Sequence, residues 1–240
     1  MPARLAIVAV LALLPLLAPL DAAADGYNDW SAEITEPGRI WIVPAWQQRV
    51  SPVAESYAQL QLQIGLAPKV DLILSGALWM TAKRQVPDVT WIQPRIEILP
   101  GLALSPGISL QGAGDGDPSG WLPGLFATID SGPWRCNINI IGGLPFVDAS
   151  AGEIFAPFVF QRRFTPEVAA FVELDVTSGF AAPTSPALDA FIGTQIELGA
   201  LDTLNISLSV PVRPEFAPTN VALGISWSHG VRLDPVRWGR

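Results

Sequence analysis

The sequence has very little of the chemistry on which enzymes, metal sites and disulfide scaffolds depend. Its 240 residues include one cysteine, Cys136, and one histidine, His229. A single cysteine excludes an intramolecular disulfide, and we expect Cys136 to be a small hydrophobic residue rather than a reactive thiol. The sequence contains no Cys/His cluster, phosphate-binding loop or dinucleotide motif. We therefore expect no metal and no cofactor.

Charge is also scarce, and the little that is present is mostly acidic. Only 15% of the residues are charged, 50% are hydrophobic, and the formal net charge is −8. Nucleic-acid binding needs clustered Lys and Arg, so we expect no nucleic-acid partner. Beyond the N-terminal region, no run reaches the roughly 20 apolar residues of a spanning helix. Such a hydrophobic chain must either bury a very large core or meet lipid through strands.

The N-terminus has the pattern of a secretory signal peptide. Arg4 precedes an apolar stretch over residues 5–20, and Ala22-Ala23-Ala24 fits an A-x-A cleavage site. We predict a signal peptide over 1–24 with cleavage after Ala24. The alternative is an uncleaved membrane anchor. Residues 25–38 are predicted to form a short periplasmic lead-in, and 39–240 a single domain.

Within 39–240, alternating apolar and polar residues recur in segments of about 10 to 13 residues. Period-two alternation is the signature of a strand whose two faces meet different surroundings. The predicted strands are 39–50, 57–67, 70–82, 90–100, 102–113, 120–130, 133–143, 153–164, 167–179, 188–199, 201–212 and 219–231.

The connections between these segments alternate in length. Short corners such as Pro100-Gly101 and Gly199-Ala200 are typical of tight hairpins, because Gly and Pro preset turn dihedrals. Longer Pro- or Gly-rich connections separate the hairpins. Short periplasmic turns and longer outside loops characterise outer-membrane barrels, and an even strand number places both termini in the periplasm. The predicted fold is all-β: a closed antiparallel up-and-down transmembrane β-barrel of about twelve strands.

The polar face of the predicted strands is rich in Gln, Asn and Ser, with some charges of both signs. We expect this face to line a hydrated or hydrogen-bonded lumen and the apolar face to contact lipid. A soluble β-sandwich also alternates, but it would expose a more strongly charged surface. The predicted lumen-lining residues are Gln59, Gln61, Gln63, Arg95, Glu97, Arg135, Asn137, Asn139, Glu173, Asp175, Gln195, Glu197, Asn205 and Ser207.

Several tryptophans lie at the ends of the predicted strands, next to connections. Outer-membrane barrels carry aromatic girdles at both membrane interfaces. The alternative is that they are ordinary strand aromatics. The predicted girdle consists of Trp41, Trp79, Trp91, Trp121, Trp134 and Trp227.

Five prolines fall inside predicted strands, where each deletes a hydrogen-bond donor. A closed barrel has no edge strand, so we expect them near the rims or at bulges, or else the strands are shorter than drawn. They are Pro44, Pro94, Pro106, Pro123 and Pro157.

The stretch "FIGTQIELGALDTLNISLSV" (191–210), with Gly193 early in one strand and Asp202 at the turn, resembles the hairpins of bacterial outer-membrane β-barrels. These barrels are of the small porin or transporter type, including the MetA-pathway-of-phenol-degradation-like barrels. The resemblance implies a barrel in the outer membrane of a Gram-negative bacterium.

Catalysis has few candidates in this sequence. His229 follows Ser226 and Ser228 in the sequence "SWSHG", but neighbouring strand residues point to opposite faces, so we expect a rim or girdle histidine. Paired carboxylates such as Glu173 and Asp175 are expected to pair with arginines or set ion preference. In "GAGDGDPSG" (112–120), the two aspartates lack the spacing of a calcium loop, which favours a plain outside loop.

The preferred function is passive passage of ions or small solutes through a polar lumen. The alternative is a non-transporting structural or surface-binding barrel with a filled lumen. A barrel lipid hydrolase and a soluble secreted sandwich are less favoured. The expected partners are outer-membrane lipid, small solutes or ions, and the barrel-assembly machinery during biogenesis, with the oligomeric state left open.

Overall fold

The computed structural model describes residues 31–49, 55–80, 85–110, 119–180, 187–212 and 221–233. The predicted signal peptide, its cleavage site and most of the 112–120 loop lie outside these residues. Among the described residues, no helix has the length and apolar character needed to cross a membrane.

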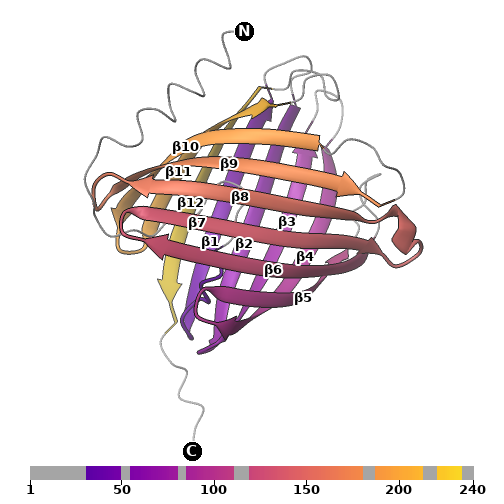
Figure 1. Ribbon diagram of the computed structural model, residues 1–240, viewed down its shortest axis with the longest axis horizontal. Helices are drawn as coiled ribbons and strands as arrows, with labels where there is room; N and C mark the ends of the chain where they lie inside the picture. The colour runs from indigo at the N-terminus through magenta and orange to yellow at the C-terminus, as the bar shows by residue number, and fades with distance from the viewer. Residues whose placement is uncertain are drawn as a thin grey trace, which may run out of the picture.

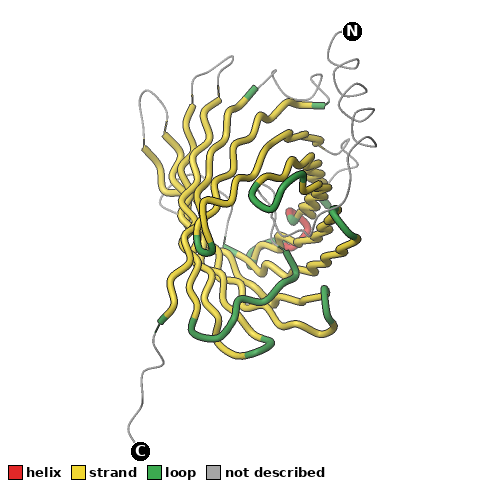
Figure 2. The backbone as a smooth tube through the Cα atoms, turned by 90° about the vertical axis from the view of Figure 1, so that its left-hand side faces the viewer, coloured by secondary structure: helices red, strands yellow, loops and turns green. Residues whose placement is uncertain are grey.

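The described chain forms twelve antiparallel strands joined into one closed barrel (Figure 1). Each strand pairs with its neighbours in the sequence, and β1 closes the ring by pairing with β12 from Arg39 opposite Arg232 to Arg49 opposite Ala222. Figure 2 shows the strands enclosing a common interior. The strands are β1 (Arg39–Arg49), β2 (Glu55–Ala67), β3 (Val70–Met80), β4 (Gln85–Leu99), β5 (Leu102–Leu110), β6 (Gly120–Ser131), β7 (Trp134–Pro145), β8 (Glu153–Arg163), β9 (Val168–Gly179), β10 (Ala187–Gly199), β11 (Asp202–Pro211) and β12 (Ala222–Arg232). A 3-10 turn, η2 (Ala149–Ala151), lies between β7 and β8.

The predicted up-and-down barrel is confirmed, and each predicted segment corresponds to one strand. The largest difference is at β4, which begins at Gln85 rather than at residue 90. The extra residues continue the pairing with β3, where Gln85 lies opposite Met80 after a register shift between Gly76 and Leu78. Sequence alternation missed this extension because a shift in register interrupts the period-two pattern.

Two of the tight turns require glycine. Gly101 and Gly132 have φ of 74° and 59°, a region that residues with a side chain rarely adopt. At Gly101 a Cβ would also lie 2.6 Å from the carbonyl oxygen of Thr128. These turns keep the hairpin connections short at one end of the barrel, hereafter the turn end; the opposite end is the loop end.

Burial along the strands is the reverse of that in a soluble sheet. In β11, Asn205 and Ser207 are buried, whereas Ile206 and Leu208 are exposed. The same inversion holds in β2, where Gln61 is buried and Leu60 is 50% exposed. Polar side chains therefore face the interior and apolar side chains form the outer surface, as lipid contact demands.

The five strand prolines lie within the strands, so the prediction that they occupy rims or bulges is wrong. Each has a partner on one neighbouring strand, but the pairing skips it on the other side without a change of register. The pairs Ile92–Ile108 and Ile96–Leu104 place Pro94 directly opposite Pro106. In an antiparallel ladder, every second pair of opposite residues exchanges both of its hydrogen bonds. With proline at both positions of such a pair, neither residue has an N–H to donate, so no N–H is left without a partner at this point.

We expect a charge on the outer surface to destabilise the barrel according to its depth. Leu60 lies in the middle of β2, and the equally outward Leu66 lies near the turn end. Leu60→Arg should lower the free energy of unfolding by about 2–4 kcal/mol, and Leu66→Arg by about 1 kcal/mol or less. Urea titration of vesicle-reconstituted protein, followed by tryptophan fluorescence, measures both. Equal losses would contradict a lipid-facing outer surface.

Candidate functional site

A short N-terminal stretch lies inside the barrel rather than outside it. Residues 31–36, the inner segment, include buried Ser31, Ala32 and Thr35. Ala32 belongs to an interior apolar cluster with inward-facing Ile73 and Phe126. This contact places the second half of the predicted 25–38 lead-in against the inner wall.

The inner segment is fixed to the wall by directed contacts. The backbone N–H of Ala32 donates to the Thr128 hydroxyl (2.7 Å), and that of Thr35 donates to Asp71 Oδ2 (3.0 Å). At Gly65 a Cβ would lie 2.0 Å from the carbonyl oxygen of Glu36. Glycine at this position of β2 therefore leaves the space that the segment's backbone occupies.

A fully buried ion pair anchors this arrangement. Arg95 of β4 donates from Nε to Asp71 Oδ1 (3.0 Å) and from Nη2 to Asp71 Oδ2 (2.6 Å), and both side chains are inaccessible to solvent. Arg95 also donates to the carbonyl oxygens of Ser31 and Glu33. Gln63 Nε2 donates to Asp71 Oδ2 as well (3.0 Å). A bidentate pair with additional hydrogen bonds is the geometry in which a buried guanidinium is tolerated.

A second arginine binds the segment through a side chain. Arg135 of β7 contacts Glu33 from Nη1 and Nη2 (3.2 and 2.8 Å) and Asp130 from Nε and Nη2 (2.8 and 3.1 Å). The guanidinium thus lies between two carboxylates from different parts of the chain. This pairing joins the inner segment to β6 and β7 near the turn end.

The opposite side of the barrel carries further polar contacts. Arg163 Nη2 donates to Glu197 Oε1 (2.7 Å), and Gln161 Nε2 donates to Gln195 Oε1 (2.9 Å). Asn205 Nδ2 donates to the Ser226 hydroxyl (3.2 Å). Side chains from neighbouring and next-neighbouring strands therefore bond to one another across the inner wall.

The residues predicted to line the lumen all alternate with outward-facing neighbours on their strands. The predicted lining residues that are partly buried are Gln59, Gln63, Glu97 and Glu197. Those that are buried are Gln61, Arg95, Arg135, Asn137, Asn139, Glu173, Asp175, Gln195, Asn205 and Ser207.

Other buried polar residues share these surroundings but were not predicted. Asp71, Gln93 and Gln161 follow the same period-two alternation, so the sequence signal for them was present. Ser31 and Thr35 had no such signal, because the inner segment has no alternation that marks a buried face.

Only part of the inner wall is accessible to water. The inward residues of β1 are half-buried rather than buried, and so are Tyr57 and Gln59 of β2. Gln59 Nε2 donates to the Ser75 hydroxyl (2.7 Å), which holds the amide along the wall. We call this surface the accessible wall; it comprises Trp41, Val43, Ala45, Gln47, Tyr57 and Gln59.

Comparison with known proteins identifies the architecture. No family model and no curated protein matches this sequence. An outer membrane channel from Pseudomonas putida F1 is similar in structure, with a TM-score of 0.60 and 10% identity over 87% of this chain and 100% of the other. The fold is that of an outer-membrane β-barrel.

Two porin structures have the same fold. The KdgM porin has a TM-score of 0.59 at 10% identity, covering 79% of this chain and 98% of that chain. The NanC porin has a TM-score of 0.58 at 10% identity, covering 78% and 98%. A further structure is the KdgM porin in complex with disordered oligogalacturonate, with a TM-score of 0.54 at 10% identity, covering 80% and 98%.

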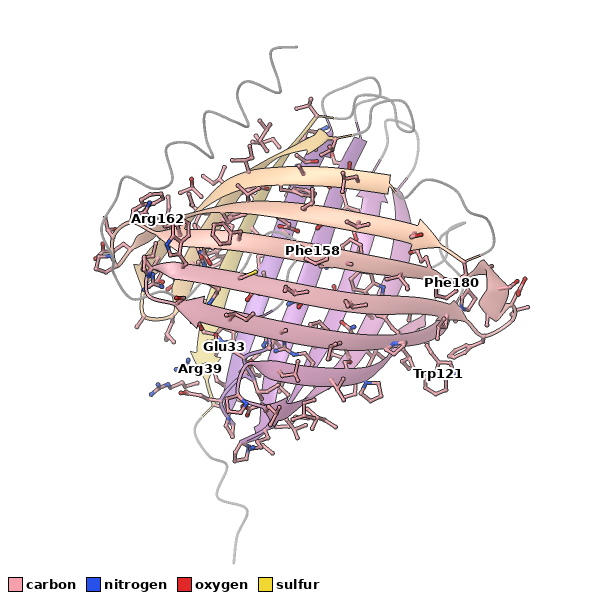
Figure 3. The ribbon with its side chains drawn as sticks, viewed as in Figure 1. Glu33, Arg39, Trp121, Phe158, Arg162 and Phe180 are labelled. Atoms are coloured by element: carbon pink, nitrogen blue, oxygen red, sulfur yellow. The ribbon has the colours of Figure 1, made fainter. Side chains whose placement is uncertain are left out.

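Three of the predicted girdle tryptophans lie on the outer surface of the barrel. Trp121 contacts Phe146 edge-on (5.6 Å between ring centroids) at the loop end, and Trp134 stacks on Phe160 (4.8 Å). Trp227 is exposed on β12. Figure 3 shows Trp121 and Phe180 at the opposite end of the barrel from Arg162, whose guanidinium lies 4.8 Å from the Trp134 ring.

For two other tryptophans, the girdle prediction is wrong. Trp91 packs against the interior apolar cluster. Trp41 faces inward over Gly230, where a Cβ would lie 2.9 Å from the indole ring. Their position at strand ends suggested a girdle, but the alternation puts both on the polar face. The side chain of Trp79 lies outside the described part.

His229 lies on the outer side of β12 and contacts an acid. Its Nδ1 is 2.7 Å from Asp202 Oδ1, and the Trp227 Nε1–H donates to the same oxygen (3.2 Å). Ser226 is buried on the inner side. The histidine and this serine therefore face opposite sides of the wall, an arrangement unsuited to a Ser-His pair.

The remaining candidates for a site lie in connections. In the described ranges, no group of three or more His, Cys, Asp or Glu residues could hold a metal ion. Beside η2, hydrogen bonds from the Ser150 hydroxyl and then from its backbone N–H lower the pKa of the exposed Asp148 carboxyl. This contact caps the turn.

Loss of the buried arginine should be costly, in contrast to loss of a more accessible one. Arg95→Met leaves Asp71 buried without its counter-ion and should lower the free energy of unfolding by about 3–5 kcal/mol. Arg163→Met, whose partner Glu197 reaches solvent, should cost about 1 kcal/mol or less. Urea titration in vesicles measures both.

The double variant Arg95→Met/Asp71→Leu removes both charges of the buried pair, and we expect it to recover part of the loss. Equal effects of the two arginine variants would contradict the anchoring role of the buried pair.

Proposed function

We propose that this barrel is a passive channel in the outer membrane of a Gram-negative bacterium and admits ions or small solutes. One observation carries the proposal: apolar side chains face outward, polar ones face inward, and one part of the inner wall remains accessible to water. Porins and a channel with the same fold support it.

The filled part of the lumen limits what can pass. The inner segment and its ion pairs occupy the side formed by β3 to β7, and the polar residues in the middle of β8 to β11 are buried as well. The path that we propose therefore follows β1 and β2. A narrow path with glutamine and tyrosine on its wall suits ions and small hydrophilic molecules rather than bulky ones.

The predicted lining residues divide into two roles under this proposal. Gln59 and Gln63 of β2 border this path, and the partly accessible Glu97 and Glu197 lie at its turn end, where a permeating solute would meet them. The buried members hold the interior together through hydrogen bonds and ion pairs. Both roles require their polar face to point inward.

Export and insertion complete the proposal. The predicted signal peptide, cleaved after Ala24, would direct the chain to the periplasm. The barrel-assembly machinery would then insert it, with the turn end in the periplasm and outer-membrane lipid around the apolar surface. We propose no catalytic activity, because the surroundings of His229 lack the geometry of a Ser-His pair.

Purified protein should form channels in planar lipid bilayers. The expected result is discrete conductance steps from folded protein, recognised by its heat-modifiable migration on gels, and none from the same protein after boiling. Folded protein that gives no conductance would contradict the channel and favour a barrel whose lumen is closed.

The proposed path can be located with single cysteines. In a Cys136→Ser background, a charged methanethiosulfonate should lower the conductance of Gln59→Cys by roughly half, because residue 59 borders the path. Asn139→Cys is the matched control, since Asn139 is inaccessible to solvent. Block at residue 139 without block at 59 would place the path elsewhere.

A further inference from the structure

Apart from the fully buried Arg95–Asp71 pair, the ion pairs described in the lumen share one arrangement: the arginine is buried and its carboxylate reaches water. Arg135 is 3% exposed, whereas its partners Glu33 and Asp130 are 56% and 47% exposed. Arg163 is 12% exposed and its partner Glu197 is 35% exposed. A solute in the lumen therefore meets the carboxylates before it meets the guanidinium groups.

The inner segment supplies this arrangement at two places. Its Glu33 covers Arg135, and its Glu36 covers Arg39 at the rim, where the two groups are 3.2 Å apart and 68% and 19% exposed, respectively. Figure 3 labels Glu33 and Arg39 at the same end of the barrel. The segment also covers Arg95 with two backbone carbonyl oxygens. Three arginines are thus shielded from the lumen by six residues.

The other charged residues at the turn end do not make its water-facing surface basic. The exposed bases Lys69 and Arg232 lie at the rim, in the turn after β2 and at the end of β12. Glu97 adds a further partly accessible carboxylate to the inner wall. The water-facing surface inside the turn end is therefore acidic.

We infer that the inner segment sets the charge selectivity of the channel and makes it prefer cations. The inference rests on the proposed channel function. Carboxylates that line a narrow, poorly solvated passage attract cations and repel anions. The guanidinium groups lie behind these carboxylates, and Arg135 balances only one of the two carboxylates that it contacts, so this cluster keeps one net negative charge. Anionic sugars of the oligogalacturonate type would accordingly be poor solutes for this barrel.

The test measures the reversal potential of the channel in planar bilayers across a tenfold KCl gradient. For the unmodified protein we expect a potassium-to-chloride permeability ratio above about 3. The double variant Glu33→Gln/Glu36→Gln should lower this ratio at least about twofold, because it removes the segment's charges but keeps amides that can hydrogen-bond. Glu167→Gln changes an exposed carboxylate in the turn before β9 and should leave the ratio unchanged.

The outcomes separate the two proposals. A ratio at or below one for the unmodified protein, or an unchanged ratio in the double variant, overturns the inference while the channel stands. Absence of conductance from folded protein overturns the channel and the inference with it. Heat-modifiable migration shows that each variant is folded. Vesicle swelling gives an independent readout, in which choline should enter faster than galacturonate.

Discussion

Closure of the hydrogen-bond ladder between β1 and β12 is the constraint on which the rest of the structure depends. In hydrocarbon, an open sheet edge would leave a row of unpaired N–H and C=O groups. Closure removes that edge and lets apolar side chains cover most of the outer surface. At Pro94 and Pro106, which face each other across β4 and β5, the ladder lacks two donors at the same place, so no N–H is left without a partner there.

Closure creates a second problem, which is how to satisfy the polar face that it encloses. A barrel of twelve strands is too wide for side chains from its own wall to meet everywhere. The inner segment fills one side, and its backbone groups become partners for wall residues such as Asp71 and Thr128. Arg95 is the centre of this arrangement, since it bonds to both the wall and the segment. The wall and the segment therefore stabilise each other.

The inner segment also determines which part of the inner wall remains accessible from the lumen. With β3 to β7 covered by the segment, β1 and β2 provide the water-accessible surface. The segment also determines which charged groups face the lumen, because it covers arginines with carboxylates and carbonyl oxygens. Similarity to porins at 10% identity establishes the fold. The properties of this lumen follow from its own residues.

The sequence by itself determined the twelve strands, their antiparallel order and the inward direction of residues such as Gln61 and Asn137. It could do so because each strand separates lipid from a polar interior, so apolar and polar residues alternate along every segment. Only the tertiary structure decided where 31–36 lie, that Trp91 faces inward, and that Asp71 is the partner of Arg95. Those facts depend on contacts between residues far apart in the chain and on the width of the closed barrel, neither of which leaves a local pattern in the sequence.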